Sequence, residues 1–177
     1  MDKKKIEAQV TALLKEYGYE FDKDDYVNIV EFVQRLGFVV GNAQLDDAED
    51  GFLAIQASSM AKNKNGVSSD KIIGVNSKRS LEWKRFIIAH EFAHSVLHYN
   101  NTGTIYLHRE NKKGKDSEEN EADYFAAALL MPEKAFKRLY NQFNQNALSK
   151  TAICLQLSAI FKVPFDSVSR RIDEVGI

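Results

Sequence analysis

One short segment of the sequence, HEFAH at residues 90–94, has residue types and spacing that favour metal chemistry. His90 and His94 are four residues apart, so on an α-helix they lie one turn apart on the same face. Two imidazoles in that arrangement can bind one zinc ion at about 2.0–2.1 Å each. Glu91 is rotated by about 100° from His90 around the helix axis and therefore flanks the metal position. There it can act as a general base on a water molecule.

The alternative for this segment is a helix that carries two ordinary histidines and one solvated glutamate. By residue frequency, the pattern H-E-x-x-H arises by chance in roughly one chain in 150 of this composition. Glu91 argues against the alternative, because a carboxylate beside a buried helix face is unfavourable unless something pairs with it. We therefore expect a metal site. A catalytic zinc site needs a third protein ligand and one open position.

Several histidines could be considered as the third ligand. His98 continues the spacing but lies about 12 Å along a straight helix from His90, whereas ligand atoms on one zinc are about 3.3 Å apart. We expect His98 to support the site or the fold, or to be an ordinary surface histidine. His108 is a distant possibility from a loop or strand. The metzincin extension is missing, because Leu97 and Asn100 replace its glycine and its third histidine.

The best source of the third ligand is a later acidic helix that we expect to end near Met131. Glu119 shares a face of this helix with Asp123 and with small alanines that allow a close approach to the zinc helix. Asp123 could accept a hydrogen bond from the outer nitrogen of a ligating histidine and so fix its tautomer. Glu118 and Glu121 lie on other faces, where negative charge favours a helix N-terminus. We expect Glu119 to complete the zinc site, with a helix-cap role as its alternative.

Hydrophobic spacing and cap signals predict an α+β fold. Helices come first, then a few strands, then helices again, which predicts a small antiparallel or mixed sheet packed on a helical layer. The helix predicted over residues 81–99 is apolar around most of its circumference and should lie buried at the centre. The predicted helices span residues 3–17, 26–36, 81–99, 117–131, 133–143, 149–161 and 165–175, and the predicted strands span 38–40, 52–57, 71–76 and 104–108.

Turn-forming residues predict where the chain divides. Asp24 or Asp25 can cap the second helix, residues 58–70 predict a hairpin-type loop, and the Asn/Gln-rich segment 141–146 predicts a linker. We expect one domain over residues 1–145 that carries the metal site. We expect a C-terminal helical hairpin over residues 146–177 that packs on it.

Composition excludes several classes of protein. The 177 residues are 44% hydrophobic, which supports a sizeable core and excludes disorder of the whole chain. The net charge of −1 gives no sign of broad binding to a phosphate backbone. Cys154 is the single cysteine, so no intrachain disulfide can form, which fits a reducing compartment. We find no secretory signal and no run near the roughly 20 apolar residues of a membrane helix, so we expect a cytoplasmic protein without membrane contact.

The sequence resembles the ImmA/IrrE family of zinc metallo-endopeptidases over most of its length. The resemblance rests on FIIAHEFAHSVLH at residues 86–98, on ENEADYFA at residues 119–126 and on LLMP at residues 129–132. It implies a zincin-like metallopeptidase domain and gluzincin-like proteolysis inside bacterial cells. In the family pattern the third ligand falls on Glu119. Where this chain has Asp123 the family more often has asparagine, so an acceptor is kept and a negative charge is added.

The resemblance also implies a kind of substrate. Known relatives cleave helix-turn-helix repressors of mobile genetic elements or of stress regulons, so we expect an intracellular repressor of that class as substrate and partner.

In the expected reaction, Glu91 would take a proton from the attacking water and pass it to the leaving amine. The strand at residues 71–76 precedes the zinc helix, and if it is a sheet edge a substrate could add to it as an extra strand. Ordinary pairing inside the sheet is the alternative.

A regulatory protein with a non-catalytic zinc site is the competing interpretation. Residues 157–172 loosely resemble a helix-turn-helix, with Arg170 and Arg171 on its second helix, which would make the chain a DNA- or partner-binding module. We favour a helical hairpin that packs apolar residues such as Leu155 and Ile160 on the core. Two arginines opposed by nearby acidic residues are a thin basic patch, so nucleic acid is not an expected partner.

Overall fold

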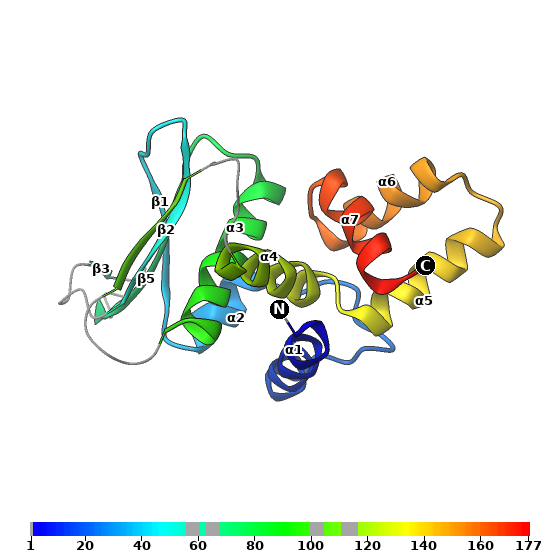
Figure 1. Ribbon diagram of the computed structural model, residues 1–177, viewed down its shortest axis with the longest axis horizontal. Helices are drawn as coiled ribbons and strands as arrows, with labels where there is room; N and C mark the ends of the chain where they lie inside the picture. The colour runs from blue at the N-terminus through cyan, green and yellow to red at the C-terminus, as the bar shows by residue number, and fades with distance from the viewer. Residues whose placement is uncertain (1, 56–60, 63–67, 100–104, 111–116) are drawn as a thin grey trace. The chain divides into compact units, whose positions relative to one another are not determined.

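The computed structural model describes residues 2–55, 61–62, 68–99, 105–110 and 117–177 (Figure 1). The fold is α+β, with elements in the order that the sequence predicts. The helices are α1 (Lys3–Tyr17), α2 (Ile29–Arg35), α3 (Leu81–Leu97), α4 (Ser117–Leu130), α5 (Glu133–Gln145), α6 (Lys150–Phe161) and α7 (Phe165–Val175). The strands are β1 (Val39–Ala43), β2 (Glu49–Ile55), β3 (Ala61–Lys62), β4 (Ser68–Ser69), β5 (Lys71–Asn76) and β6 (Ile105–Glu110).

These elements form two compact units. One contains residues 28–126, and the other contains residues 2–27 together with residues 127–177. The first unit holds the sheet, α2, α3 and most of α4. The expected division of the chain into a domain of residues 1–145 and a hairpin of residues 146–177 stays a prediction. The compact units group α1 and α5 with the C-terminal helices.

In the unit of residues 28–126, four described strands form one mixed sheet in the order β1-β5-β2-β6. β1 runs parallel to β5, whereas β2 runs antiparallel to both β5 and β6. β5 therefore has a hydrogen-bonded neighbour on each side. The hypothesis that residues 71–76 form a sheet edge for a substrate strand is wrong, and ordinary pairing inside the sheet is confirmed.

A second described ladder pairs β3 with β4 in antiparallel fashion inside the expected hairpin-type loop. Residues 58–60 and 63–67 of that loop lie outside the described residues, as do Thr104 and residues 111–115. The strand expected at residues 104–108 is present as β6 and continues to Glu110.

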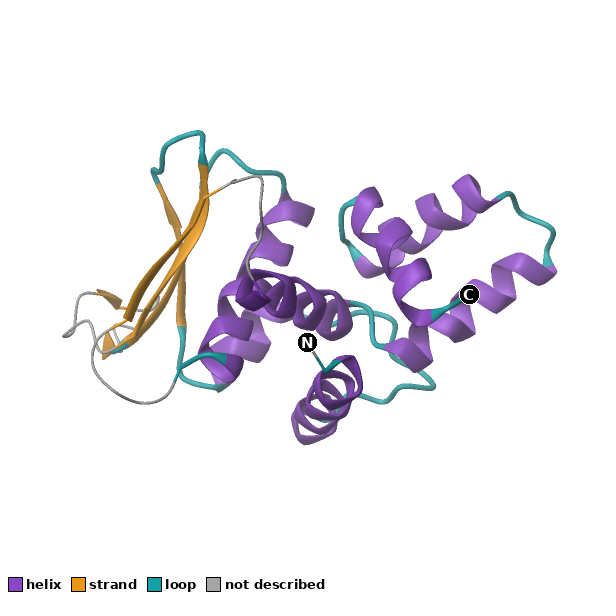
Figure 2. Cartoon of the chain, viewed as in Figure 1, coloured by secondary structure: helices purple, strands orange, loops and turns teal. Residues whose placement is uncertain are grey.

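The helix α3 packs against β2 and β5, and Figure 2 shows the helices of this unit on one side of the strands. It begins after Ser80, whose hydroxyl accepts a hydrogen bond from the backbone N–H of Trp83 at 3.2 Å. Every residue from 85 to 94 is buried. The prediction of a central, buried helix is confirmed.

Two neighbouring residues of β2 fix how α3 lies on the sheet. At Gly51 a Cβ atom would lie 2.5 Å from Cγ2 of Ile87, so only glycine allows the helix this close. Asp50 is 2% exposed and accepts hydrogen bonds from Nε of Arg79 at 2.6 Å and from Nε1 of Trp83 at 3.2 Å. This buried carboxylate therefore ties β2 to the start of α3.

The second unit is built from helices that bury apolar stripes. The buried residues of α1 are Ile6, Val10 and Leu14, which lie on one face, and Gly18 ends the helix in the left-handed region at φ 93°. The helices α6 and α7 meet at a bend of 107°. No single helix in the described residues is long and apolar enough to cross a membrane; only this bent pair meets that test jointly, by length and composition alone.

Arg171 of the second unit is 0% exposed. Its Nη2 atom lies 2.7 Å from a carboxylate oxygen of Glu7 on α1, and its Nε donates to the backbone oxygen of Met131 at 3.1 Å. Because this guanidinium is enclosed and paired, it does not present a positive charge to a nucleic acid. Arg170, the other arginine of the expected patch, is exposed, so the helical hairpin over residues 157–172 stays a prediction.

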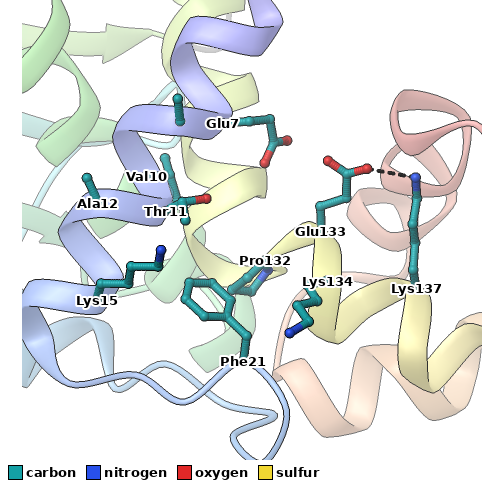
Figure 3. A pocket seen from close by; sticks show the side chains of 11 residues that line it. Glu7, Val10, Thr11, Ala12, Lys15, Phe21, Pro132, Glu133, Lys134 and Lys137 are labelled. Carbon is teal, nitrogen blue, oxygen red and sulfur yellow. Dashed lines mark hydrogen bonds and ion pairs between the residues drawn. The ribbon is translucent and has the colours of Figure 1, made fainter.

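A cavity of about 810 Å³ lies between α1 and the beginning of α5, inside the second unit (Figure 3). Val10, Phe21 and Pro132 give it apolar walls. On the α5 side, Nζ of Lys137 lies 2.7 Å from Oε1 of Glu133. Part of the cavity wall is therefore apolar, and the opposite charges of Glu133 and Lys137 at the cavity neutralise each other.

Three local predictions are wrong. α2 begins at Ile29 rather than near residue 26, because Asp24 accepts a hydrogen bond from the backbone N–H of Glu20 at 2.7 Å and closes a turn there. Residues 141–145 of the expected linker are the last turn of α5. Leu155, expected in the core, is 57% exposed.

Candidate metal centre

Two helices of the first unit carry the candidate ligands. His90 and His94 lie one turn apart on α3 and are 0% and 6% exposed. Glu119 lies in the first turn of α4, with its side chain 32% exposed. Ala122 and Ala126 follow on α4 and are fully buried, in agreement with the expectation that small residues allow a close helix approach.

The ligand atoms of these three side chains converge. Nε2 of His90 lies 3.1 Å from Nε2 of His94, and these two nitrogens lie 3.3 Å and 3.1 Å from the two carboxylate oxygens of Glu119. One ligand atom from each residue lies within 4.8 Å of the others. Tetrahedral zinc separates its ligand atoms by about 3.3 Å, so the residues fit a zinc ion.

The protonation of the site also fits a cation. Nδ1 of His90 lies 2.9 Å from Oδ1 of Asp123, a carboxylate that can only accept, so this nitrogen carries the proton. In the neutral ring Nε2 then presents a lone pair toward Glu119. In the metal-free site, protonated ring nitrogens of His90 and then of His94 would donate to Glu119 and hold its pKa well below the usual range, so its carboxylate is ionised. Ionised oxygen and imidazole nitrogen therefore face one point, which favours a divalent metal.

Glu91 is the predicted general base and is 1% exposed. Its side chain is directed toward β2, because its Oε1 lies 3.8 Å from the position that a Cβ at Gly51 would take. The next residue, Phe92, anchors this turn of α3. Its ring lies 5.6 Å from that of Phe32 and 5.7 Å from that of Phe38.

The structure also brings together two residues that sequence reasoning did not pair. Nδ1 of His98 lies 2.9 Å from Nδ1 of His94, and Nε2 of His98 lies 3.4 Å from Oε2 of Glu121. The four-residue spacing of the two histidines could have indicated the first contact. The second contact depends on how α4 crosses α3, for which the sequence carries no local signal. The side chain of His108 lies outside the described residues.

This α+β fold, with two helices that gather a His-His-Glu group, is typical of metallopeptidase-type proteins. The chain belongs to the Peptidase_M78 family, whose model, described as the IrrE N-terminal-like domain, matches residues 46–173. The resemblance noted in the sequence is therefore confirmed.

The fold is shared with a solved structure described as a Mycobacterium tuberculosis transcriptional regulator. The two are 16% identical, with a TM-score of 0.56. The match covers 96% of this chain but 47% of the regulator, so the chain spans about half of that structure's length. No curated protein sequence matches the chain significantly.

Proposed function

We propose that the protein is a zinc-dependent endopeptidase that cleaves an intracellular protein in the cytoplasm. The observation that carries the proposal is the convergence of His90, His94 and Glu119, whose ligand atoms lie within 4.8 Å of one another. The buried Glu91 follows His90 directly in α3. Membership in a metallopeptidase family supports the same reaction class.

In this proposal each side chain has one role. The three converging residues hold Zn²⁺, and Asp123 orients the His90 ring from behind. Bound zinc would supply Lewis-acid polarisation of the scissile carbonyl and of the attacking water. Glu91 accepts the proton of that water on a carboxylate oxygen and then donates it to the nitrogen of the leaving amine.

The proposed substrate is a helix-turn-helix repressor of a mobile genetic element or of a stress regulon. Two observations support a link to transcription: the resemblance to the ImmA/IrrE family, and the fold shared with a protein described as a transcriptional regulator. The competing proposal, a regulatory DNA- or partner-binding protein with a non-catalytic zinc site, shares the metal ligands but requires no proton transfer by Glu91.

Two variants test the proposal. Zinc content is measured by elemental analysis, and cleavage of a panel of purified helix-turn-helix repressors is followed by mass spectrometry of new N-termini. Glu119→Ala should lose zinc, whereas Glu91→Gln should keep zinc and lose cleavage. Zinc at full occupancy in Glu119→Ala would require another third ligand. Undiminished cleavage by Glu91→Gln, in a preparation free of other proteases, would contradict the general-base role.

A further inference from the structure

The outer nitrogens of the two candidate ligand histidines have different partners. Nδ1 of His90 meets the Asp123 carboxylate directly at 2.9 Å. Nδ1 of His94 instead meets a second imidazole, His98, at the same distance, and that ring reaches the carboxylate of Glu121. We propose that His98 and Glu121 form a positioning pair that holds His94 in its metal-binding tautomer. This inference rests on the proposed zinc site.

Metal binding by His94 determines the direction of both hydrogen bonds, from His94 to His98 and from His98 to Glu121. If Nε2 of His94 binds the metal, its proton must be on Nδ1, which then donates to His98. Nδ1 of His98 must therefore be unprotonated, so a neutral His98 carries its one proton on Nε2. That proton faces Oε2 of Glu121 at 3.4 Å, a long contact to a carboxylate that can only accept. Glu121 thus favours the one tautomer of His98 that can accept from His94.

Charge gives a reason for two different partners. The Glu119 carboxylate faces both ligand rings, and the Asp123 carboxylate adds a second negative charge behind His90. A third carboxylate directly behind His94 would raise the local repulsion further. The His98 ring supplies a neutral acceptor at that place and separates Glu121 from the ligand by the width of an imidazole.

Both members of the pair are held in place. His98 is the C-cap residue of α3, and its backbone N–H donates to the backbone oxygen of His94 at 3.1 Å. Its side chain is 11% exposed and that of Glu121 is 27% exposed, so water competes little at the ring and somewhat at the carboxylate. Glu121 comes from α4, the helix that also supplies the third candidate ligand.

Two substitutions of His98 separate an acceptor role from packing. His98→Asn keeps an acceptor, because its amide oxygen is as many bonds from Cβ as the ring Nδ1. His98→Leu keeps more of the volume but has no acceptor. The zinc dissociation constant of the full chain is measured by competition with a chromophoric chelator. His98→Leu should weaken zinc binding about 10–100-fold, and His98→Asn should stay close to wild type. Packing alone predicts the reverse order, and that order would overturn the proposal.

The pair predicts coupling between its members. Glu121→Ala should weaken zinc binding severalfold in the wild-type background and have no further effect when combined with His98→Leu. Glu118 is an exposed glutamate of the same helix, so Glu118→Ala is the matched control and should leave zinc binding unchanged. Independent effects of Glu121→Ala and His98→Leu would show that they do not act through one contact.

Two further measurements keep the outcomes distinct. Long-range nitrogen–proton NMR of the zinc-loaded wild type should show His98 with its proton on Nε2, and a proton on Nδ1 would refute the pair. Wild-type protein that binds no zinc would refute the proposed function itself. Tight zinc binding by both wild type and His98→Leu would leave the metal site standing and remove only the positioning pair.

Discussion

At the scale of single residues, the candidate site concentrates acidic groups around two imidazoles. Asp123 lies at one outer nitrogen, Glu119 faces both inner nitrogens, and Glu91 is buried on the same helix turn. Carboxylates gathered in a buried place repel one another unless a positive charge is shared among them. A divalent cation would supply that charge, and imidazoles with fixed tautomers would be its neutral ligands.

Asp123 gives the first residue-scale prediction. Asp123→Asn keeps an oxygen acceptor for Nδ1 of His90 and removes one negative charge, so zinc affinity should change only severalfold. Asp123→Leu leaves the buried N–H of His90 without this acceptor and should weaken zinc binding about 10–100-fold. Chelator competition on the purified variants measures both. Equal affinities of the Leu and Asn variants would show that the contact does not orient the ring.

The site residues differ in how far sequence could identify them. The helical spacing of His90 and His94 predicts their convergence, and the shared face of Glu119, Asp123 and the alanines predicts which acidic residue meets them. Both arguments use only geometry within one helix. Glu121 escapes that reasoning, because its contact with a histidine depends on the crossing of two helices.

At the scale of elements, the same limit applies to strands. The residue pattern identifies β5 as a strand with its correct bounds, but it leaves open whether this strand lies at an edge or inside the sheet, and the edge hypothesis is wrong. Edge or centre is decided by which strands pair, and β1 reaches β5 only by long-range parallel pairing. The Asn/Gln-rich end of α5 shows the complementary case. Polar composition predicts a linker there, but α5 continues to Gln145. The buried residues Phe136 and Leu139 stabilise the helix, because packing of an apolar face contributes more than local composition.

The contact between α3 and β2 gives an element-scale prediction. In Gly51→Ala the new methyl group would lie 2.5 Å from Cγ2 of Ile87 and 2.7 Å from the backbone oxygen of Gly74, so the helix must move from the sheet. We expect the free energy of unfolding to fall by about 1–3 kcal/mol. Zinc binding should weaken as well, because α3 carries both candidate histidines. Urea unfolding measures the first effect.

A second strand glycine provides the control. Gly41 lies in β1, and a Cβ there would meet nothing within 4 Å. Gly41→Ala should therefore change the free energy of unfolding by no more than about 0.5 kcal/mol. If both variants lose stability equally, the loss reflects alanine in a strand rather than the approach of helix and sheet.

At the scale of the whole molecule, one buried ion pair joins distant parts of the sequence. Arg171 of α7 is 0% exposed and meets Glu7 of α1 at 2.7 Å. Glu7→Ala removes the nearest anion from an enclosed guanidinium, so the free energy of unfolding should fall by about 3 kcal/mol. Glu7 also lines the cavity of Figure 3, so its loss admits water toward Arg171.

Glu16→Ala is the matched control for that variant, since Glu16 is an exposed glutamate of the same helix. It should change the free energy of unfolding by less than about 0.5 kcal/mol. Similar losses in the two variants would mean that α1 responds to any glutamate removal and that the buried pair is not what stabilises the unit.

Glu174 predicts how the stability of the protein depends on pH. Burial raises the pKa of Glu174 above its ordinary value of 4.5, although Arg171 and then Lys3 and Arg170 lower it in part. The folded state therefore holds this proton more tightly than the unfolded state. Its contribution to stability is complete below pH 4.5 and is lost as the pH rises through the raised pKa.

Glu174→Gln removes this titration and leaves the neighbouring charges in place. As the pH rises from 4 toward 7, the difference in unfolding free energy between variant and wild type should shift in favour of the variant. About ten urea unfolding curves spread over this pH range would measure the shift. A difference that is constant over this range would show that Glu174 has the same pKa in both states. A shift in favour of wild type would show that Arg171 outweighs burial and that the carboxylate is a stabilising partner of the buried guanidinium.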